Sequence, residues 1–210
     1  LNKRFRGSLE AKWDGKSLMI RKRAGAPDDL PLLPHNYYKR TKANYDSALD
    51  WHAEKSMSYD WTRQIDRFLK NLPSSPSILD AGCGTGRDID EFRERGIHIT
   101  GVDYSSQTIS ALRKKFPGTK FIEADLRETG LPGNSYDAIW ACASLLNLYK
   151  QDIGSALTEF RRLLKASVWL FISLKVGEGE GMVPDKSGER FFSWFSEREL
   201  RHIVEQAGFV

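Results

Sequence analysis

Residues 77–88 constrain the fold more than any other stretch of the chain. They begin with a short apolar run that ends in Asp80, and an amphipathic pattern starts at Arg87. Three glycines stand between them at alternate positions: Gly82, Gly84 and Gly86. Because glycine lacks a Cβ, the backbone can turn sharply here and a ligand can approach it. The first amides of a helix also point toward such a ligand. The stretch therefore predicts a strand, a tight loop and a helix N-terminus that together bind a ligand.

The spacing of the glycines excludes two common phosphate-binding loops. A dinucleotide fingerprint, G-x-G-x-x-G, needs its third glycine where this chain has Arg87. The P-loop pattern G-x-x-x-x-G-K-[ST] is absent. The chain instead carries D-x-G-x-G-x-G from Asp80 to Gly86.

Acidic residues also stand near the ends of the next two expected strands. Residues 97–103 are predicted to form the second strand, which ends in Asp103, and residues 120–126 the third, which contains Asp125 near its end. A helical pattern over residues 105–116 separates them, and residues 136–141 predict a fourth strand. Strands that alternate with helices predict right-handed crossovers and a parallel sheet, whose ligands bind outside the carboxyl ends of the strands. A carboxylate at the end of the second strand can accept both hydroxyls of a ribose.

These four segments, in this order, resemble the class I S-adenosylmethionine (SAM)-dependent methyltransferases over roughly residues 45–210. The resemblance implies an α/β fold that is Rossmann-like and doubly wound, with a mainly parallel sheet, helices on both faces and a helical lid; an N-terminal hairpin is predicted beside it from the residues themselves. It implies SAM as the cofactor and S-adenosylhomocysteine as its product. In this family the glycine loop makes room for the methionine portion, the second acid binds ribose and the third faces adenine. The cofactor-binding residues that it implies are Asp80, Gly82, Gly84, Gly86, Asp103, Tyr104, Asp125, Leu126 and Ala141.

The same resemblance places the acceptor side at the lid and at the loops after the fourth and fifth strands. In similar methyltransferases the segment before the first strand covers SAM and the substrate, so Tyr45 and Trp51 are candidates to stack on either; packing on the domain is the alternative. Many small-molecule relatives have a histidine where this chain has Asn147. Since an amide cannot serve as a general base, Asn147 is a substrate-contact candidate and no catalytic residue is assigned.

A Gly-Glu-Gly-Glu-Gly stretch at residues 177–181 follows the expected fifth strand, residues 168–174. It is predicted to be a loop beside the reaction side. Glu178 and Glu180 are candidates to hold a cationic substrate or to take a proton, and a solvated loop is the alternative. Arg190 is a candidate to pair with one of these acids or with a substrate carboxylate.

Composition narrows the class of protein further. A chain of 210 residues is long enough for a full core. Its two cysteines form neither a disulfide framework nor a C-x-x-C motif, so a cytoplasmic location is expected. No apolar run reaches the length of a membrane span and no signal peptide is visible, so no membrane partner is expected. The four histidines lack ligand spacing, and no metal is expected.

The net charge of +4 is unevenly distributed. Residues 1–42 hold 11 Lys and Arg against 4 Asp and Glu, whereas the remainder holds 21 against 24. A solvated basic face is favoured for this arm over binding of nucleic acid. We divide the chain into a basic arm and lid, residues 1–56, and a SAM-binding domain, residues 57–210.

The two ends of the chain raise a question about the sheet. The chain stops at Val210, where the sixth strand of the family would begin, so the terminal strands are expected to be missing. Alternating apolar residues around Asp14 and Gly15 predict an N-terminal hairpin. Nothing in the sequence directs this hairpin to the vacant edge.

The leading functional prediction is a SAM-dependent methyltransferase that moves a methyl group to a small-molecule acceptor by in-line displacement. Methylation of RNA or protein with the help of the basic arm is one alternative. A non-catalytic SAM-binding regulator or partner subunit is another. The acceptor and the oligomeric state are not predicted.

Overall fold

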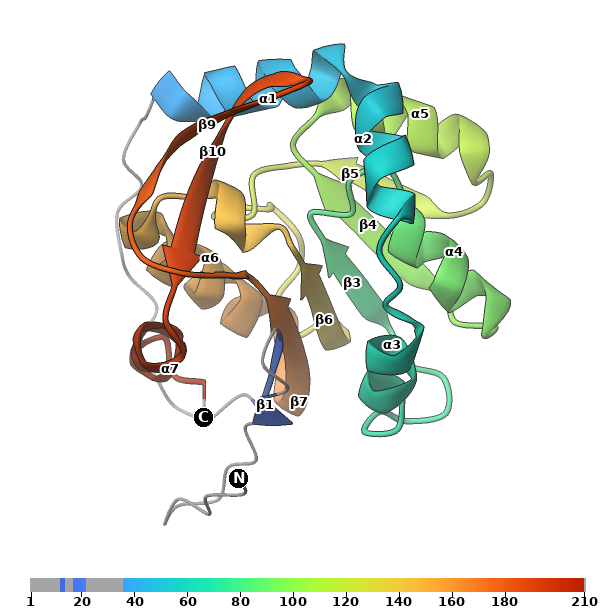
Figure 1. The fold of residues 1–210 in the computed structure, drawn as a ribbon. Helices are drawn as coiled ribbons and strands as arrows, with labels where there is room; N and C mark the ends of the chain where they lie inside the picture. Colours follow the sequence, from blue (N-terminus) through green and yellow to red (C-terminus); the bar gives the residue numbers. More distant parts are fainter. Residues whose placement is uncertain (1–11, 14–16, 22–35, 210) are drawn as a thin grey trace.

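The computed structural model describes residues 12–13, 17–21 and 36–209. Their main sheet has seven strands in the order β1-β2-β7-β6-β3-β4-β5 (Figure 1). Its parallel strands are β3 (Ile78–Ala81), β4 (Ile99–Asp103), β5 (Lys120–Glu123), β6 (Tyr136–Cys142) and β7 (Leu164–Ser173). Strand β3 pairs with both β4 and β6, so the strand order reverses there. The expected doubly wound sheet is confirmed, and its switch point lies beside the glycine loop.

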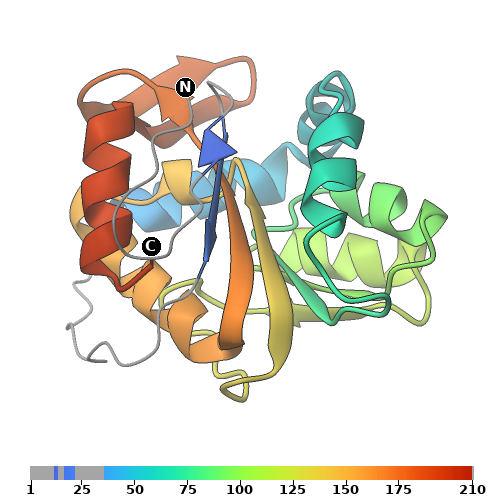
Figure 2. The ribbon, with the colours of Figure 1, turned by 90° about the horizontal axis from the view of Figure 1, so that it is seen from below.

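Helices cover both faces of this sheet because its strands alternate apolar side chains between the two faces. On one face Leu79 and Ile139 belong to a buried cluster with α6 (Lys150–Leu163) and α7 (Glu197–Gln206). On the other, Ile78 and Trp140 pack with the remaining core helices. Those helices are α3 (Thr62–Leu69), α4 (Arg87–Glu94) and α5 (Ser106–Lys115). Figure 2 shows the two groups of helices on opposite sides of the strands.

The N-terminal hairpin occupies the sheet edge beside β7. Strands β1 (Lys12–Trp13) and β2 (Ser17–Arg21) are antiparallel, and β2 pairs antiparallel with β7 from Ser17 opposite Ser173 to Arg21 opposite Trp169. The hairpin therefore covers the edge for which the sequence indicated no partner. The rest of the basic arm up to residue 35 lies outside the described residues.

Residues 175–195 form a second sheet, which takes in part of the stretch 177–181 that was predicted to be a loop. It contains β8 (Lys175–Val176), β9 (Glu180–Asp185) and β10 (Gly188–Phe195), in the order β8-β10-β9. The loop prediction is wrong at residues 180–181, which begin β9 because they pair with β10. Strand β10 packs beneath α1 (Asn36–Ser47), where the Phe191 amide donates to Thr41 Oγ1 at 3.0 Å. This sheet and α1 together roof the carboxyl ends of the main strands (Figure 1).

Two further elements complete the region above the sheet. Helix α2 (Leu49–Met57) descends toward the glycine loop, and the Ser56 and Thr85 hydroxyls are 2.9 Å apart. A short 3-10 helix, η1 (Leu145–Asn147), follows β6. Strand β5 ends at Glu123, three residues earlier than predicted, so Asp125 lies in the loop after it. No helix within the described ranges combines the length and apolar character that a membrane crossing needs.

Candidate functional site

A cavity of about 570 Å³ opens at the carboxyl ends of the strands, at the switch point of the sheet. The glycine loop, the start of the loop after β4 and the segment after β6 form its base. Helix α2 and strand β10 supply its upper wall. The volume lies within the range of about 300–1,000 Å³ that is typical of small-molecule sites.

The three glycines of the loop have different neighbours. All have positive φ: +81° at Gly82, +49° at Gly84 and +80° at Gly86. A Cβ on Gly82 would overlap with the side chain of Ser144, and a Cβ on Gly86 would lie 2.5 Å from Leu112 Cδ2. A Cβ on Gly84 would meet no atom within 4 Å. Gly84 therefore presents bare backbone to the cavity, whereas the other two glycines permit close packing.

Asp103 joins the glycine loop to the end of β4. Its Oδ2 accepts from the Gly84 amide at 3.0 Å, and its Oδ1 accepts from the Ser105 amide at 2.9 Å. Burial raises the pKa of Asp103, and the hydrogen bonds from Ser105 and Gly84 oppose that rise. The carboxylate is thus held at the cavity wall in one orientation, where it can accept hydrogen bonds from a ligand.

Asp80 lies beneath this loop and outside the cavity lining. Its side chain is buried, and Oδ2 has no hydrogen-bond partner among the described residues. Burial and the nearby charge of Asp88 raise its pKa well above the usual range for an aspartate. Asp80, which was predicted to bind the cofactor, therefore does not line the cavity.

The upper wall brings together three residues from distant parts of the chain that were predicted to contact the methyl acceptor. The Tyr45 hydroxyl donates to Asn147 Oδ1 at 3.0 Å, and Arg190 Nη1 donates to the same hydroxyl at 2.9 Å. Asn147 Nδ2 in turn donates to the Phe191 carbonyl at 2.7 Å. The Tyr45 ring lies 4.4 Å from the ring of His52, centroid to centroid. A connected polar network therefore faces the glycine loop across the cavity.

The cavity includes only some of the residues predicted from the sequence. Those that line it are Tyr45, Gly82, Gly84, Asp103, Tyr104, Leu126, Asn147 and Arg190. Those that do not are Trp51, Asp80, Gly86, Asp125, Ala141, Glu178 and Glu180.

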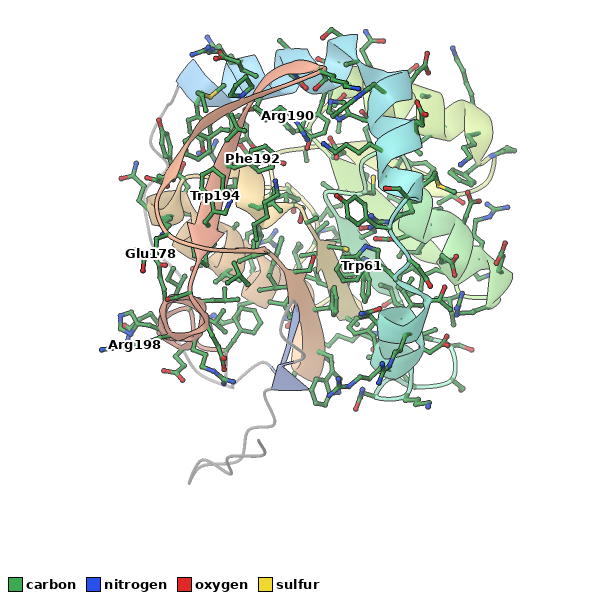
Figure 3. The ribbon with its side chains drawn as sticks, in the orientation of Figure 1. Trp61, Glu178, Arg190, Phe192, Trp194 and Arg198 are labelled. Carbon is green, nitrogen blue, oxygen red and sulfur yellow. The ribbon has the colours of Figure 1, made fainter. Side chains whose placement is uncertain are left out.

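Specific contacts explain why the acidic candidates lie elsewhere. Asp125 accepts from Arg127 Nη2 at 2.7 Å and is held in the loop after β5. Glu180 accepts from the Lys150 amide at 2.8 Å, at the start of α6, and from Ser193 Oγ of β10 at 3.2 Å. Glu178 lies near α7, away from Arg190 (Figure 3). The second sheet thus directs both glutamates away from the cavity.

Several lining residues were missed by the sequence analysis. Arg87 forms an ion pair with Asp88, with Nε 2.5 Å from Oδ1, and its Nη2 lies 3.2 Å from Cys142 Sγ. Trp61 Nε1 and Ser144 Oγ are buried polar atoms without a hydrogen-bond partner among the described residues. Trp61 stands at helical spacing with apolar residues of α3, a pattern that indicates core packing. No sequence signal marked Ser144, which faces the loop only because β6 lies beside β3.

A metal centre is not built by the described part of the chain, which holds no group of three His, Cys, Asp or Glu side chains that could bind one ion.

Comparisons with known proteins find methyltransferases. A family model described as "Methyltransferase domain" matches residues 78–167. The chain is 34% identical over 168 residues to YqeM of Bacillus subtilis (strain 168), a protein named as a methyltransferase, covering 72% of this chain and 66% of that protein. It is 27% identical over 105 residues to the malonyl-[acyl-carrier protein] O-methyltransferase of Enterobacter lignolyticus (strain SCF1), covering 49% of this chain and 41% of that protein.

Solved structures share the same fold. One is the 1,6-didemethyltoxoflavin-N1-methyltransferase of Burkholderia thailandensis, whose structure contains 1,6-didemethyltoxoflavin and S-adenosylhomocysteine. It aligns with a TM-score of 0.67 and 21% identity over 94% of this chain and 87% of that one. The chain spans 66% and 41% of the length of the two curated relatives described above.

Proposed function

The chain belongs to the class I SAM-dependent methyltransferases, and from this premise we propose that it binds SAM in the cavity and transfers the methyl group to a small-molecule acceptor. The observation that carries this proposal is the pairing of bare backbone at Gly84 with the fixed carboxylate of Asp103 at the switch point of the sheet. The bound small molecule named for the Burkholderia enzyme supports an acceptor of similar size.

The residues present fit the cofactor at four places. Gly84 leaves room for a ligand close to the backbone, and Asp103 can accept hydrogen bonds from ribose hydroxyls. Trp61 Nε1 is a donor only, so the group that satisfies it must be an acceptor, such as the carboxylate of the methionine portion. Ser144 Oγ offers a further polar contact. Leaving such buried polar groups unpaired costs about 1–3 kcal/mol each, which favours a polar ligand.

SAM supplies an electrophilic methyl carbon when it is bound, and the protein would align the two reactants and exclude water from them. The base of the cavity would hold the cofactor, while Tyr45, Asn147 and Arg190 would hold the acceptor. Helices α1 and α2 contribute Tyr45, His52 and Ser56 to the wall of the site, where they would limit access of water. Alignment of the two reactants is worth about 7–11 kcal/mol in the most favourable intramolecular reactions.

His52 is the one imidazole among the described lining residues, and its Nε2 is hydrogen bonded to Asn44 Oδ1 at 2.8 Å.

Calorimetric titration with SAM and with S-adenosylhomocysteine tests the cofactor site. We expect Asp103→Ala to weaken binding at least about tenfold, or about 1.4 kcal/mol, because a charged hydrogen-bond acceptor is lost. Asp137→Ala is the matched control, since Asp137 pairs with Lys165 and does not line the cavity. Unchanged affinity in folded Asp103→Ala would refute the ribose role, and no binding by the unmodified chain would refute the proposed function.

A further inference from the structure

We propose that Trp61 and Ser144 recognise the two charged groups of the amino-acid portion of the cofactor: Trp61 binds its carboxylate and Ser144 its ammonium group. The inference rests on the proposed function, because it takes the cavity to be the site for SAM and S-adenosylhomocysteine. It goes further by predicting which shortened cofactors the protein binds poorly. Three observations support it: the place of the two residues beside the sheet, their unpaired polar atoms and the balance of charge next to them.

Trp61 and Ser144 lie on the side of the glycine loop that is remote from Asp103. The loop follows β3, which lies between β6 and β4 in the sheet. Asp103 ends β4, whereas Ser144 follows β6 and approaches the loop at Gly82, where a Cβ would lie 2.3 Å from Ser144 Cβ. The Trp61 ring packs edge-on against that of Phe171 in β7, with the centroids 6.1 Å apart. A cofactor whose ribose lies at Asp103 therefore reaches these two residues by crossing the glycine loop.

The same strand order assigns the two ends of the cofactor. Strand β5 lies beyond β4, and Leu126, which follows β5, adds an apolar side chain to the cavity lining. The flat adenine ring fits this direction, so the charged amino-acid portion extends in the other direction, toward β6. Figure 3 shows Trp61 well apart from Arg190 and Phe192 of β10, which lie on the wall proposed for the acceptor.

The polar atoms of both residues are buried and have no hydrogen-bond partner among the described residues, although both side chains line the cavity. Trp61 Nε1 can only donate, so its partner must be an acceptor such as a carboxylate oxygen. Ser144 Oγ also accepts, so it can receive an N–H of an ammonium group. Because burial keeps water from these atoms, a ligand that pairs with them removes a penalty that the free protein carries. Side-chain rotations of the kind that are common on binding bring the ligand into reach of them.

The charged groups beside Trp61 form a pair without net charge. Arg87 Nε lies 2.5 Å from Asp88 Oδ1, and the Arg87 guanidinium carbon lies 5.8 Å from the centroid of the Trp61 ring. Lys55 and Asp60 also line the cavity, but both are exposed, so water and salt screen their charges. A buried charge is costly unless it is balanced. A zwitterion brings its own balance and leaves this pair neutral, whereas a group with a single charge does not.

Calorimetric titration with four ligands tests the two assignments separately. The ligands are S-adenosylhomocysteine, its aminopropyl analogue without the carboxylate, its carboxypropyl analogue without the amine, and 5′-methylthioadenosine, which lacks both groups. We expect Trp61→Phe to weaken binding of the two carboxylate-bearing ligands at least about tenfold, because a donor to a charged group is lost, and to leave the other two within about twofold. We expect Ser144→Ala, which keeps the Cβ beside Gly82, to do the same for the two amine-bearing ligands. Trp194→Phe, a substitution outside the cavity lining, should leave all four affinities unchanged.

NMR on the unmodified chain, with its tryptophans labelled with nitrogen-15, gives a second measurement that does not depend on a folded variant. At saturation the indole N–H resonance of Trp61 should move downfield with S-adenosylhomocysteine and with the carboxypropyl analogue, because a carboxylate accepts from it. The aminopropyl analogue should move it much less. Equal shifts with all three ligands would contradict the assignment of the carboxylate to Trp61.

Failure of the inference is distinguishable from failure of the proposed function. Equal affinity of the unmodified chain for 5′-methylthioadenosine and S-adenosylhomocysteine would overturn the inference and leave the cofactor site standing. So would an effect of Trp61→Phe or Ser144→Ala that is the same for all four ligands, or a carboxylate or amine preference that survives the matching substitution. No binding of S-adenosylhomocysteine by the unmodified chain would overturn the proposed function and the inference together.

Discussion

Different glycines of the glycine loop serve ligand binding and core packing. Gly84 and Gly86 both have positive φ, but only Gly84 faces open space. Gly86 lies against Leu112 and Phe116 of the neighbouring helix region, so a side chain there would collide with the core. The repeated glycine in the sequence therefore serves two separable purposes, and matched substitutions can distinguish them.

Alanine at these two positions should have opposite effects on affinity and stability. Gly84→Ala should weaken S-adenosylhomocysteine binding at least about tenfold, because its methyl group enters ligand space, and should cost only about 1–2 kcal/mol of stability through backbone strain. Gly86→Ala should cost about 2–4 kcal/mol, because overpacking adds to the same strain. Calorimetry and urea unfolding measure the two effects. A stable Gly86→Ala, or an unaffected affinity in Gly84→Ala, would contradict this assignment.

Among the helices, α5 is connected to α1 through its N-cap residue, Ser105. Ser105 caps α5 by accepting from the Thr108 amide at 3.1 Å, and its hydroxyl donates to Asp46 of α1. Partial burial favours the neutral form of Asp46, but hydrogen bonds from Ser105 and Lys42 outweigh it and lower the pKa of that carboxyl. Ser196 caps α7 in the same way, but it is exposed, and its described contacts include no hydrogen bond to a carboxylate of another helix. The Ser-x-x-Glu spacing at residues 196–199 is typical of a helix N-cap, and the Glu199 amide donates to Ser196 Oγ at 3.2 Å.

The two caps therefore provide a matched test of the hydrogen bond between Asp46 of α1 and Ser105, the N-cap of α5. Ser196→Ala should lower the free energy of unfolding by about 1 kcal/mol, the usual value of an N-cap. Ser105→Ala should lower it by about 2–4 kcal/mol, because a hydrogen bond to a carboxylate worth about 1.5–3 kcal/mol is lost as well. Urea unfolding at pH 7 gives both values. Equal losses would show that the contact with Asp46 adds nothing to stability.

Considered as a whole, the molecule depends on its N-terminal hairpin to close one edge of the main sheet. Strand β2 pairs along β7 from Ser173 to Trp169 and satisfies backbone groups that an edge strand would expose. An exposed edge strand is a template for pairing with another chain. The hairpin thus pairs with the sheet edge for which the sequence indicated no partner strand.

Removal of this hairpin should cause association. A chain lacking residues 1–22 should elute from size-exclusion chromatography with light scattering at a higher mass than the intact chain, because β7 becomes an edge. A chain lacking residues 1–11 retains both hairpin strands and should show the same mass as the intact chain. The same mass for both truncated chains would indicate that β7 is protected by another element.

The sequence by itself determined the features that depend on neighbouring residues. The order of strands and helices, the glycine loop after Asp80, the acid that ends β4 and the cap at Ser196 all follow from patterns a few residues long. Such patterns act through backbone conformation and alternation of apolar side chains, which operate over one or two turns. For this reason the position of the site at the carboxyl ends of the strands was predictable.

Only the tertiary structure decided which side chains share the cavity. Tyr45 meets Asn147 and Arg190 across more than 100 residues, and Asp125 is withdrawn from the cavity by its pairing with Arg127. Glu180 joins a strand rather than a loop because β10 lies beside it. The physical reason is common to all three: a side chain's partner and direction depend on how distant segments pack, and no local pattern carries that information.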